Sequence, residues 1–124
     1  MSTPVDQVID AYSPKQIAER VKSSGIAKAN LPALQTLTLG ALAGAFIAFG
    51  AMFYTVVITD SSLGFGPTRF LGGIAFSLGL VLVVVAGAEL FTGNNLLFIA
   101  WAAKKISSNQ LLRNWLLVYF ANLI

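Results

Sequence analysis

The sequence of 124 residues contains no cysteine and no histidine, and only 10% of its residues are charged. The first two absences exclude disulfides, a thiol nucleophile and the usual zinc and haem ligand sets within these residues. The small charged fraction contrasts with the roughly 25% that a soluble domain normally carries. We therefore expect no cofactor and no metal, and the composition argues against a soluble protein.

Charged residues are nearly absent from two long apolar stretches. Segment 29–59 contains no Lys, Arg, Asp or Glu, and Glu89 is the single charged residue of segment 70–103. An uncharged apolar stretch of about 18 residues or more is long enough to cross a bilayer. The sequence therefore predicts an all-α membrane protein whose main partner is the lipid bilayer.

Basic residues outnumber acidic ones, 8 to 5, and they gather in the N-terminal region and in segment 104–113. Membrane proteins concentrate Lys and Arg in their cytoplasmic segments. We therefore interpret the excess as a sign of topology and expect no nucleic-acid partner. Residues 1–30 are polar and lack the apolar core of a secretory signal. We expect a multi-pass protein of the cytoplasmic membrane, with its N-terminus on the cytoplasmic side.

The N-terminal segment, residues 1–30, contains the start signal of a helix. Ser13 is a suitable N-cap, a proline follows at the first helical position, and Gln16 completes a capping box. Gly25 is expected to end this helix. The pattern predicts a short amphipathic helix over 14–24, lying at the membrane surface.

The transmembrane domain, residues 31–124, is expected to begin with a span over about 31–57. Small residues recur every four positions in this span, at Gly40, Gly44 and Ala48. Such a stripe lets two membrane helices approach closely. We therefore expect this face to pack against another helix or subunit.

The second apolar segment, about 70–103, would be about 51 Å long as one helix, well beyond the ~30 Å hydrocarbon core. It can be one strongly tilted helix, a two-span hairpin or one interrupted span. The N-terminal region and segment 104–113 are both basic and so belong on the same side. Two crossings then separate them, the first span and one more, which favours one interrupted span. A further span begins at about 110–124, with Trp115 at the interface. We expect that span to be truncated, because the ten residues 115–124 make only about half of a crossing.

The interruption is expected at the polar run 87–95. A helix can break within lipid only where protein or water satisfies the freed backbone groups. The second half-helix, starting near 92–94, would direct its free N–H groups and its positive dipole end into the membrane, which predicts an anion site. Thr92 is the expected N-cap of this half-helix.

Glu89 is costly to bury within a membrane, and such residues are usually functional. One role is structural: the carboxylate accepts hydrogen bonds from N–H groups of the loop, or pairs with a base outside these residues. The other role is proton handling, and Asn94 and Asn95 stand beside Glu89 in either case. The apolar residues near the break are either ordinary core residues or constrictions of a pore; they are Phe76, Leu80, Leu90 and Phe91.

Three runs, FSLGL at 76–80, GAELFTGNN at 87–95 and NWLLVY at 114–119, closely resemble the formate/nitrite transporter family. The similarity extends from about Ser13 to the last residue. It implies an aquaporin-like six-helix inverted-repeat fold, of which this chain holds the N-terminal half, assembled as a homopentamer with one pore in each protomer. It also implies passage of small monovalent anions, formate first and nitrite or hydrosulfide as alternatives, with gating near the broken helix.

Carried over by position, the resemblance places Phe76 and Leu80 at apolar constrictions of the pore. It places Leu90, Phe91 and Thr92 in the loop whose movement gates the pore. The predicted helix at the N-terminus matches the family's cytoplasmic N-terminal helix, for which an effect on gating is proposed.

The sequence departs from the family pattern in two ways. The family usually has glycine at the position of Ala121, and the additional methyl group is expected to tighten a helix contact. The family's second broken helix, with its pore histidine, is expected beyond Ile124.

Two other classes of function compete with an anion channel. A truncated, non-transporting membrane subunit or fragment would fit the short chain, and the gene sequence beyond codon 124 distinguishes the two. An intramembrane enzyme is disfavoured, because one carboxylate without a neighbouring histidine, cysteine or second acid forms no catalytic dyad. We therefore expect that the protein is not an enzyme.

Overall fold

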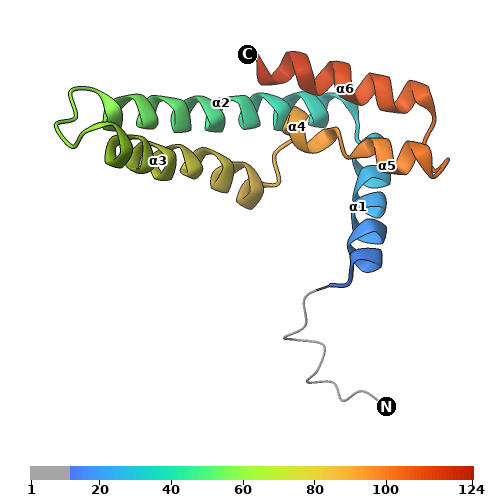
Figure 1. Ribbon diagram of the computed structural model, residues 1–124. Helices are drawn as coiled ribbons and strands as arrows, with labels where there is room; N and C mark the ends of the chain where they lie inside the picture. Colours follow the sequence, from blue (N-terminus) through green and yellow to red (C-terminus); the bar gives the residue numbers. More distant parts are fainter. Residues whose placement is uncertain (1–11) are drawn as a thin grey trace.

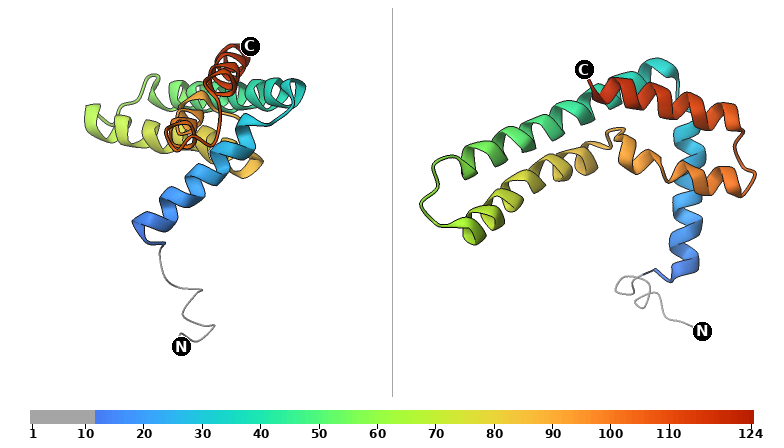
Figure 2. Two further views of the ribbon diagram at one scale, coloured as in Figure 1. Left: turned by 90° about the vertical axis from the view of Figure 1, so that its right-hand side faces the viewer. Right: turned by 45° about the horizontal axis from the view of Figure 1, so that its top comes forward.

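The computed structural model describes residues 12–124, and that range folds into six helices without a strand (Figure 1). The longest two, α2 and α3, form a hairpin, while α6 lies along the first half of α2 and α1 crosses the end opposite the hairpin turn (Figures 1 and 2). The helices are α1 (Pro14–Ala29), α2 (Ala33–Ile58), α3 (Phe65–Ala86), α4 (Phe91–Asn94), α5 (Leu97–Ala102) and α6 (Ser108–Asn122).

Helix α1 begins with the predicted capping box. The Ser13 hydroxyl accepts from the Gln16 N–H, and the Gln16 side chain accepts from the Ser13 N–H at 2.8 Å. The predicted stop at Gly25 is wrong, since the helix continues to Ala29. Gly25 is instead a packing position, where an added Cβ would lie 3.2 Å from the Cβ of Ala100 in α5. Glycine here allows α1 to lie directly on α5, and the helix continues for a further turn.

Helices α2 and α3 are long and apolar enough to cross a membrane. Only 11% and 22% of the most apolar 18-residue stretch of each is buried within the described structure. An apolar helix in the core of a soluble protein would be mostly buried, so these exposed faces fit lipid rather than water.

Close backbone packing joins α2 to its two neighbours. A Cβ on Gly50 would lie 2.9 Å from the Phe76 carbonyl oxygen of α3. A Cβ on Gly40 would lie 2.6 Å from the Cβ of Ala121, and one on Gly44 would lie 2.5 Å from a backbone oxygen of α6. The first two positions of the predicted stripe therefore face α6, whereas Ala48 is exposed. The methyl group of Ala121 is fully buried in this contact.

The basic segments that precede α2 and α6 lie together at one end of the molecule. The Gln110 side chain donates to the Asn30 side chain at 3.0 Å, and Arg113 donates to the Leu31 carbonyl at 3.3 Å. Helix α6 therefore starts beside the start of α2 and runs parallel to it (Figure 1). Neither a continuous helix over 70–103 nor a second complete hairpin is present, because the helical path stops after Ala86 and resumes as two short pieces.

Candidate functional site

The break follows α3 at Gly87, which adopts a left-handed conformation with φ 62°. The N–H groups of Gly87 and Ala88 donate back to carbonyls of the last turn of α3 at 3.2 and 3.0 Å. The next N–H, of Glu89, donates to the Leu39 carbonyl of α2 at 3.2 Å. Protein groups therefore satisfy the backbone that leaves the helix, as an interruption at membrane depth requires.

Glu89 is buried, with 3% of its surface exposed, and both of its carboxylate oxygens have partners. Lys28 of α1 donates to Oε1 at 2.8 Å, and the Asn94 side chain donates to Oε2 at 2.6 Å. The expected partners, loop N–H groups or a base outside these residues, are therefore wrong. The base lies within this chain, because α1 continues past Gly25 and carries Lys28 to the break.

Asn94 is the centre of a group of hydrogen-bonded side chains at the break, here called the polar cluster, which consists of Lys28, Glu89, Asn94, Asn114 and Asn122. Its side chain is fully buried; it donates to Glu89 and to the Asn114 side chain, the latter at 2.9 Å, and accepts from Lys28 at 3.1 Å. The carbonyl of Asn94 accepts from the Trp115 indole at 3.0 Å. Trp115 is half-buried, and this bond links α6 to the break. Asn95, in contrast, is exposed.

Asn122 of α6 holds the other side of the break. Its side-chain oxygen accepts from the Phe91 N–H at 2.8 Å. Its side-chain nitrogen donates to the carbonyls of Gly40 and Glu89 at 2.8 and 2.9 Å. One amide thus links the backbones of α2, the break and the start of α4.

The start of the second half-helix differs from the prediction, while the anion site expected there stays a prediction. The half-helix consists of two pieces of four and six residues, too short to build a substantial dipole. Its N-cap is Leu90 rather than Thr92, and the first N–H, that of Phe91, is already occupied by Asn122. Thr92 lies within α4, where it is exposed.

A cavity of about 330 Å³ lies beside the break. Three of the five predicted pore residues line it, namely Leu80, Leu90 and Thr92, and Lys28 and Glu89 line it as well. Two do not: Phe76 lies one turn earlier on α3, and the Phe91 ring packs edge-on against Tyr119, with 5.4 Å between ring centroids. The cavity therefore combines apolar walls, a hydroxyl group and one ion pair.

Three members of the polar cluster were not predicted from the sequence: Lys28, Asn114 and Asn122. Lys28 was interpreted as one of several basic residues before the first span. Asn114 and Asn122 carried a signal that was available, because an amide in an otherwise apolar membrane helix usually bonds to another helix.

Comparison with known proteins identifies relatives along nearly the whole chain. Residues 15–124 match the formate/nitrite transporter family. The formate channel FocA of Escherichia coli (strain K12) is 41% identical over 120 residues, which cover 96% of this chain and 42% of the channel. The formate channel BtFdhC of Bacillus thuringiensis is 42% identical over 117 residues, covering 91% of this chain and 44% of that protein.

A relative from an archaeon shows the same pattern. The probable formate transporter of Methanothermobacter thermautotrophicus is 34% identical over 116 residues, covering 90% of this chain and 42% of the transporter. The chain thus spans less than half the length of these curated relatives. Because the family match covers residues 15–124 and includes the break with its polar cluster, the chain belongs to the formate/nitrite transporter family.

Proposed function

We propose that this chain contributes to a channel that passes small monovalent anions across the membrane beside the break, with formate as the main substrate. The observation that carries the proposal is the cavity in which Lys28 meets apolar walls and the exposed Thr92 side chain. Three relatives described as formate channels or a probable formate transporter support formate as the cargo. Nitrite and hydrosulfide are alternative cargoes, since both are also small monovalent anions.

The ion pair removes an electrostatic objection to this path. A lone buried carboxylate would repel an anion, but the Lys28 ammonium lies 2.8 Å from the Glu89 carboxylate and neutralises it. The Lys28 side chain is also 29% exposed and lines the cavity, which supports its contact with a passing anion. In this proposal Lys28 offsets the desolvation cost of the anion, and Glu89 keeps Lys28 in place rather than carrying protons.

Leu80 and Leu90 act as an apolar constriction in this channel, and the Leu90–Thr92 segment acts as its gate. Apolar constrictions control passage through dewetting. The backbone of this segment is held by Asn122 on one side and by the short helix α4 on the other, and the Phe91 ring packs against Tyr119. Because Lys28 belongs to α1, a displacement of α1 would change the charge at the gate, and this supports a part for α1 in gating.

The wider architecture is part of the same proposal. The chain forms the N-terminal half of an aquaporin-like six-helix inverted repeat and assembles as a homopentamer in the cytoplasmic membrane. Residues 1–30 form the cytoplasmic N-terminal segment, which reaches the break through Lys28, and residues 31–124 form the transmembrane domain. Seven of the 8 basic residues belong to α1 or to segment 104–113, all except Arg69, and this bias supports the orientation. The protein acts as a channel and not as an enzyme.

The test is formate flux into proteoliposomes that contain the protein expressed from its intact gene. We expect uptake of labelled formate above that of empty vesicles, with slower uptake when nitrite or hydrosulfide competes. Vesicles without protein and vesicles with an unrelated membrane protein serve as controls. Flux of all three anions equal to that of empty vesicles would contradict the proposal and favour a non-transporting subunit.

A further inference from the structure

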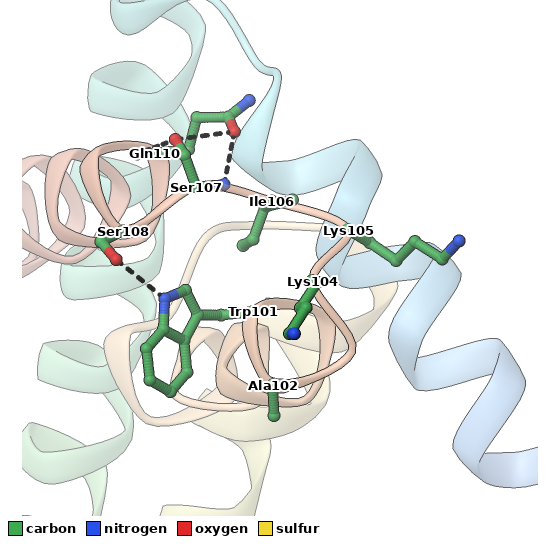
Figure 3. Close-up of a pocket in the computed structure, with 8 residues that line it drawn as sticks. All are labelled: Trp101, Ala102, Lys104, Lys105, Ile106, Ser107, Ser108 and Gln110. Atoms are coloured by element: carbon green, nitrogen blue, oxygen red, sulfur yellow. Dashed lines mark hydrogen bonds between the residues drawn. The ribbon is translucent and has the colours of Figure 1, made fainter.

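A second cavity, of about 750 Å³, lies at the end of the molecule opposite the hairpin turn, where α5 turns into α6 (Figure 3). It shares no lining residue with the cavity at the break. The residues that matter here are Trp101, Lys104, Lys105 and Ser108, all of which line it. Figure 3 shows both lysines leaving the same turn, with the Lys105 chain extending away from the indole.

The turn is basic, and its two lysines form no ion pair within the described residues. No acidic side chain lines the cavity. Within residues 12–124 the ion pairs are Lys22 with Glu19 and Lys28 with Glu89, so neither lysine of the turn takes part in one. The pKa of the Glu19 carboxyl in α1 is lowered chiefly by its hydrogen bond to Lys22, and the charge of Lys105 makes the smallest contribution. The turn therefore presents two ammonium groups to whatever lies beside it.

Lys104 occupies a backbone position that normally belongs to glycine. Its φ is 56°, and it follows the end of α5, with its N–H donating to the Trp101 carbonyl at 2.8 Å. The next N–H, of Lys105, donates to the Ala100 carbonyl at 2.9 Å. Helices commonly end with glycine in this left-handed conformation, because a Cβ is unfavourable there. A lysine at this position therefore costs some stability relative to glycine.

Trp101 is the aromatic residue of this turn. Its indole N–H donates to the Ser108 hydroxyl oxygen at 2.9 Å, and 37% of its surface is exposed. Tryptophan is enriched at the level of the lipid headgroups. The Ser108 hydroxyl accepts this bond and still has its own hydrogen to donate. Two lysines, a serine hydroxyl and an indole therefore line the same cavity.

We propose that this turn binds the phosphate headgroup of an anionic phospholipid in the leaflet that this end of the molecule faces. Lys104 and Lys105 supply the charge, Ser108 donates to a phosphate oxygen, and Trp101 lies against the start of the acyl chains. Clusters of basic residues next to membrane helices attract anionic lipid in this way. A free phosphate ion would gain from the charges but not from the indole.

The experiment measures lipid retention by native mass spectrometry of the intact gene product, purified in detergent and supplied with phosphatidylglycerol or phosphatidylcholine. The test variant is Lys104→Gln with Lys105→Gln. The matched control is Lys15→Gln with Arg20→Gln, which removes the same charge from α1. We expect retention of phosphatidylglycerol to fall roughly tenfold in the test variant and by less than about twofold in the control. Retention of phosphatidylcholine should not change.

Equal losses in the two variants would overturn the proposal, because they would indicate general attraction by charge. Displacement of the lipid by excess inorganic phosphate would overturn it too. A second variant, Lys104→Gly, separates binding from folding: it should raise the unfolding temperature by relieving the backbone while it lowers retention. Unchanged retention in Lys104→Gly would count against the assignment. None of these outcomes depends on formate flux.

Discussion

The α2–α3 hairpin and the break are held together by opposite means. In the hairpin, the backbones meet at glycines, as where Gly50 lies against α3 and Gly79 lies against α2. At the break the contacts are hydrogen bonds instead. Lys28 and Asn94 donate to the Glu89 carboxylate, and Asn122 accepts from the Phe91 N–H. A continuous helix satisfies its own backbone, so small residues are enough to join two of them in lipid. An interrupted helix needs a partner for each exposed group.

Removing the ammonium at the break is expected to have the largest effect. Lys28→Met leaves the buried Glu89 carboxylate without its counter-ion, and breaking a buried ion pair in this way costs about 3–5 kcal/mol. Thermal unfolding in detergent measures the loss. The matched variant, Lys28→Met with Glu89→Gln, removes both charges and should recover most of it. Equal stability of the single and double variants would show that the pair is not the support of the break.

Asn122→Ala tests the other side of the break. It removes the partner of the Phe91 N–H and of two carbonyls, and leaving such groups unsatisfied costs about 1–3 kcal/mol. We expect a loss near the upper end, measured by the same unfolding assay. The control is Leu123→Ala, at the neighbouring position with 69% of its surface exposed, which should change stability by less than about 0.5 kcal/mol. A similar effect of both changes would contradict the role given to Asn122.

The hairpin should respond to volume instead of to lost bonds. In Gly79→Ala the added methyl group would lie 2.8 Å from the Phe46 carbonyl oxygen and 3.2 Å from the Gly50 Cα. Backbone atoms cannot move aside easily, so we expect a loss of about 1–3 kcal/mol. Gly73→Ala on the same helix meets no atom within 4 Å and should be neutral or stabilising by up to about 1 kcal/mol. The unfolding temperatures of the two variants measure this difference in stability. Equal temperatures would show that close packing at Gly79 does not stabilise the hairpin.

Gly87, where the hairpin meets the break, should respond to neither volume nor lost bonds. An added Cβ would meet nothing within 4 Å, but the residue has φ 62°. Gly87→Ala should therefore cost only the conformational penalty of about 1–2 kcal/mol. Gly87→Asn should cost less, since asparagine tolerates this conformation better than other residues. If Gly87→Ala proved more stable than Gly87→Asn in unfolding measurements, backbone conformation would not be what sets the turn.

Local features of the fold could be predicted from the sequence. The capping box at Ser13 needs only neighbouring residues, and it forms as expected. The polar run that includes Glu89 marks the interruption because polar groups are rare within membrane helices. The stripe at Gly40 and Gly44 indicates a close contact, although the sequence does not say that α6 provides it.

The site itself depends on contacts that no local pattern contains. Lys28 and Glu89 are 61 residues apart, and their meeting depends on α1 continuing through Gly25. The rule that glycine ends helices failed there because packing against α5 outweighs glycine's low helix propensity. The expected N-cap at Thr92 is wrong, since the short helix begins after Leu90, where Asn122 reaches the Phe91 N–H from another helix.

The central claim is that the cavity at the break lies on the anion path. Formate flux through Thr92→Cys, before and after reaction with a small charged thiol reagent, tests it most directly, with wild-type protein given the same treatment as the control. Thr92 lines the cavity and is exposed, so a bulky charged adduct there should block passage. We predict that labelling lowers formate flux at least about tenfold in the variant and leaves the wild type unchanged. Complete labelling of the variant with undiminished flux would contradict the account.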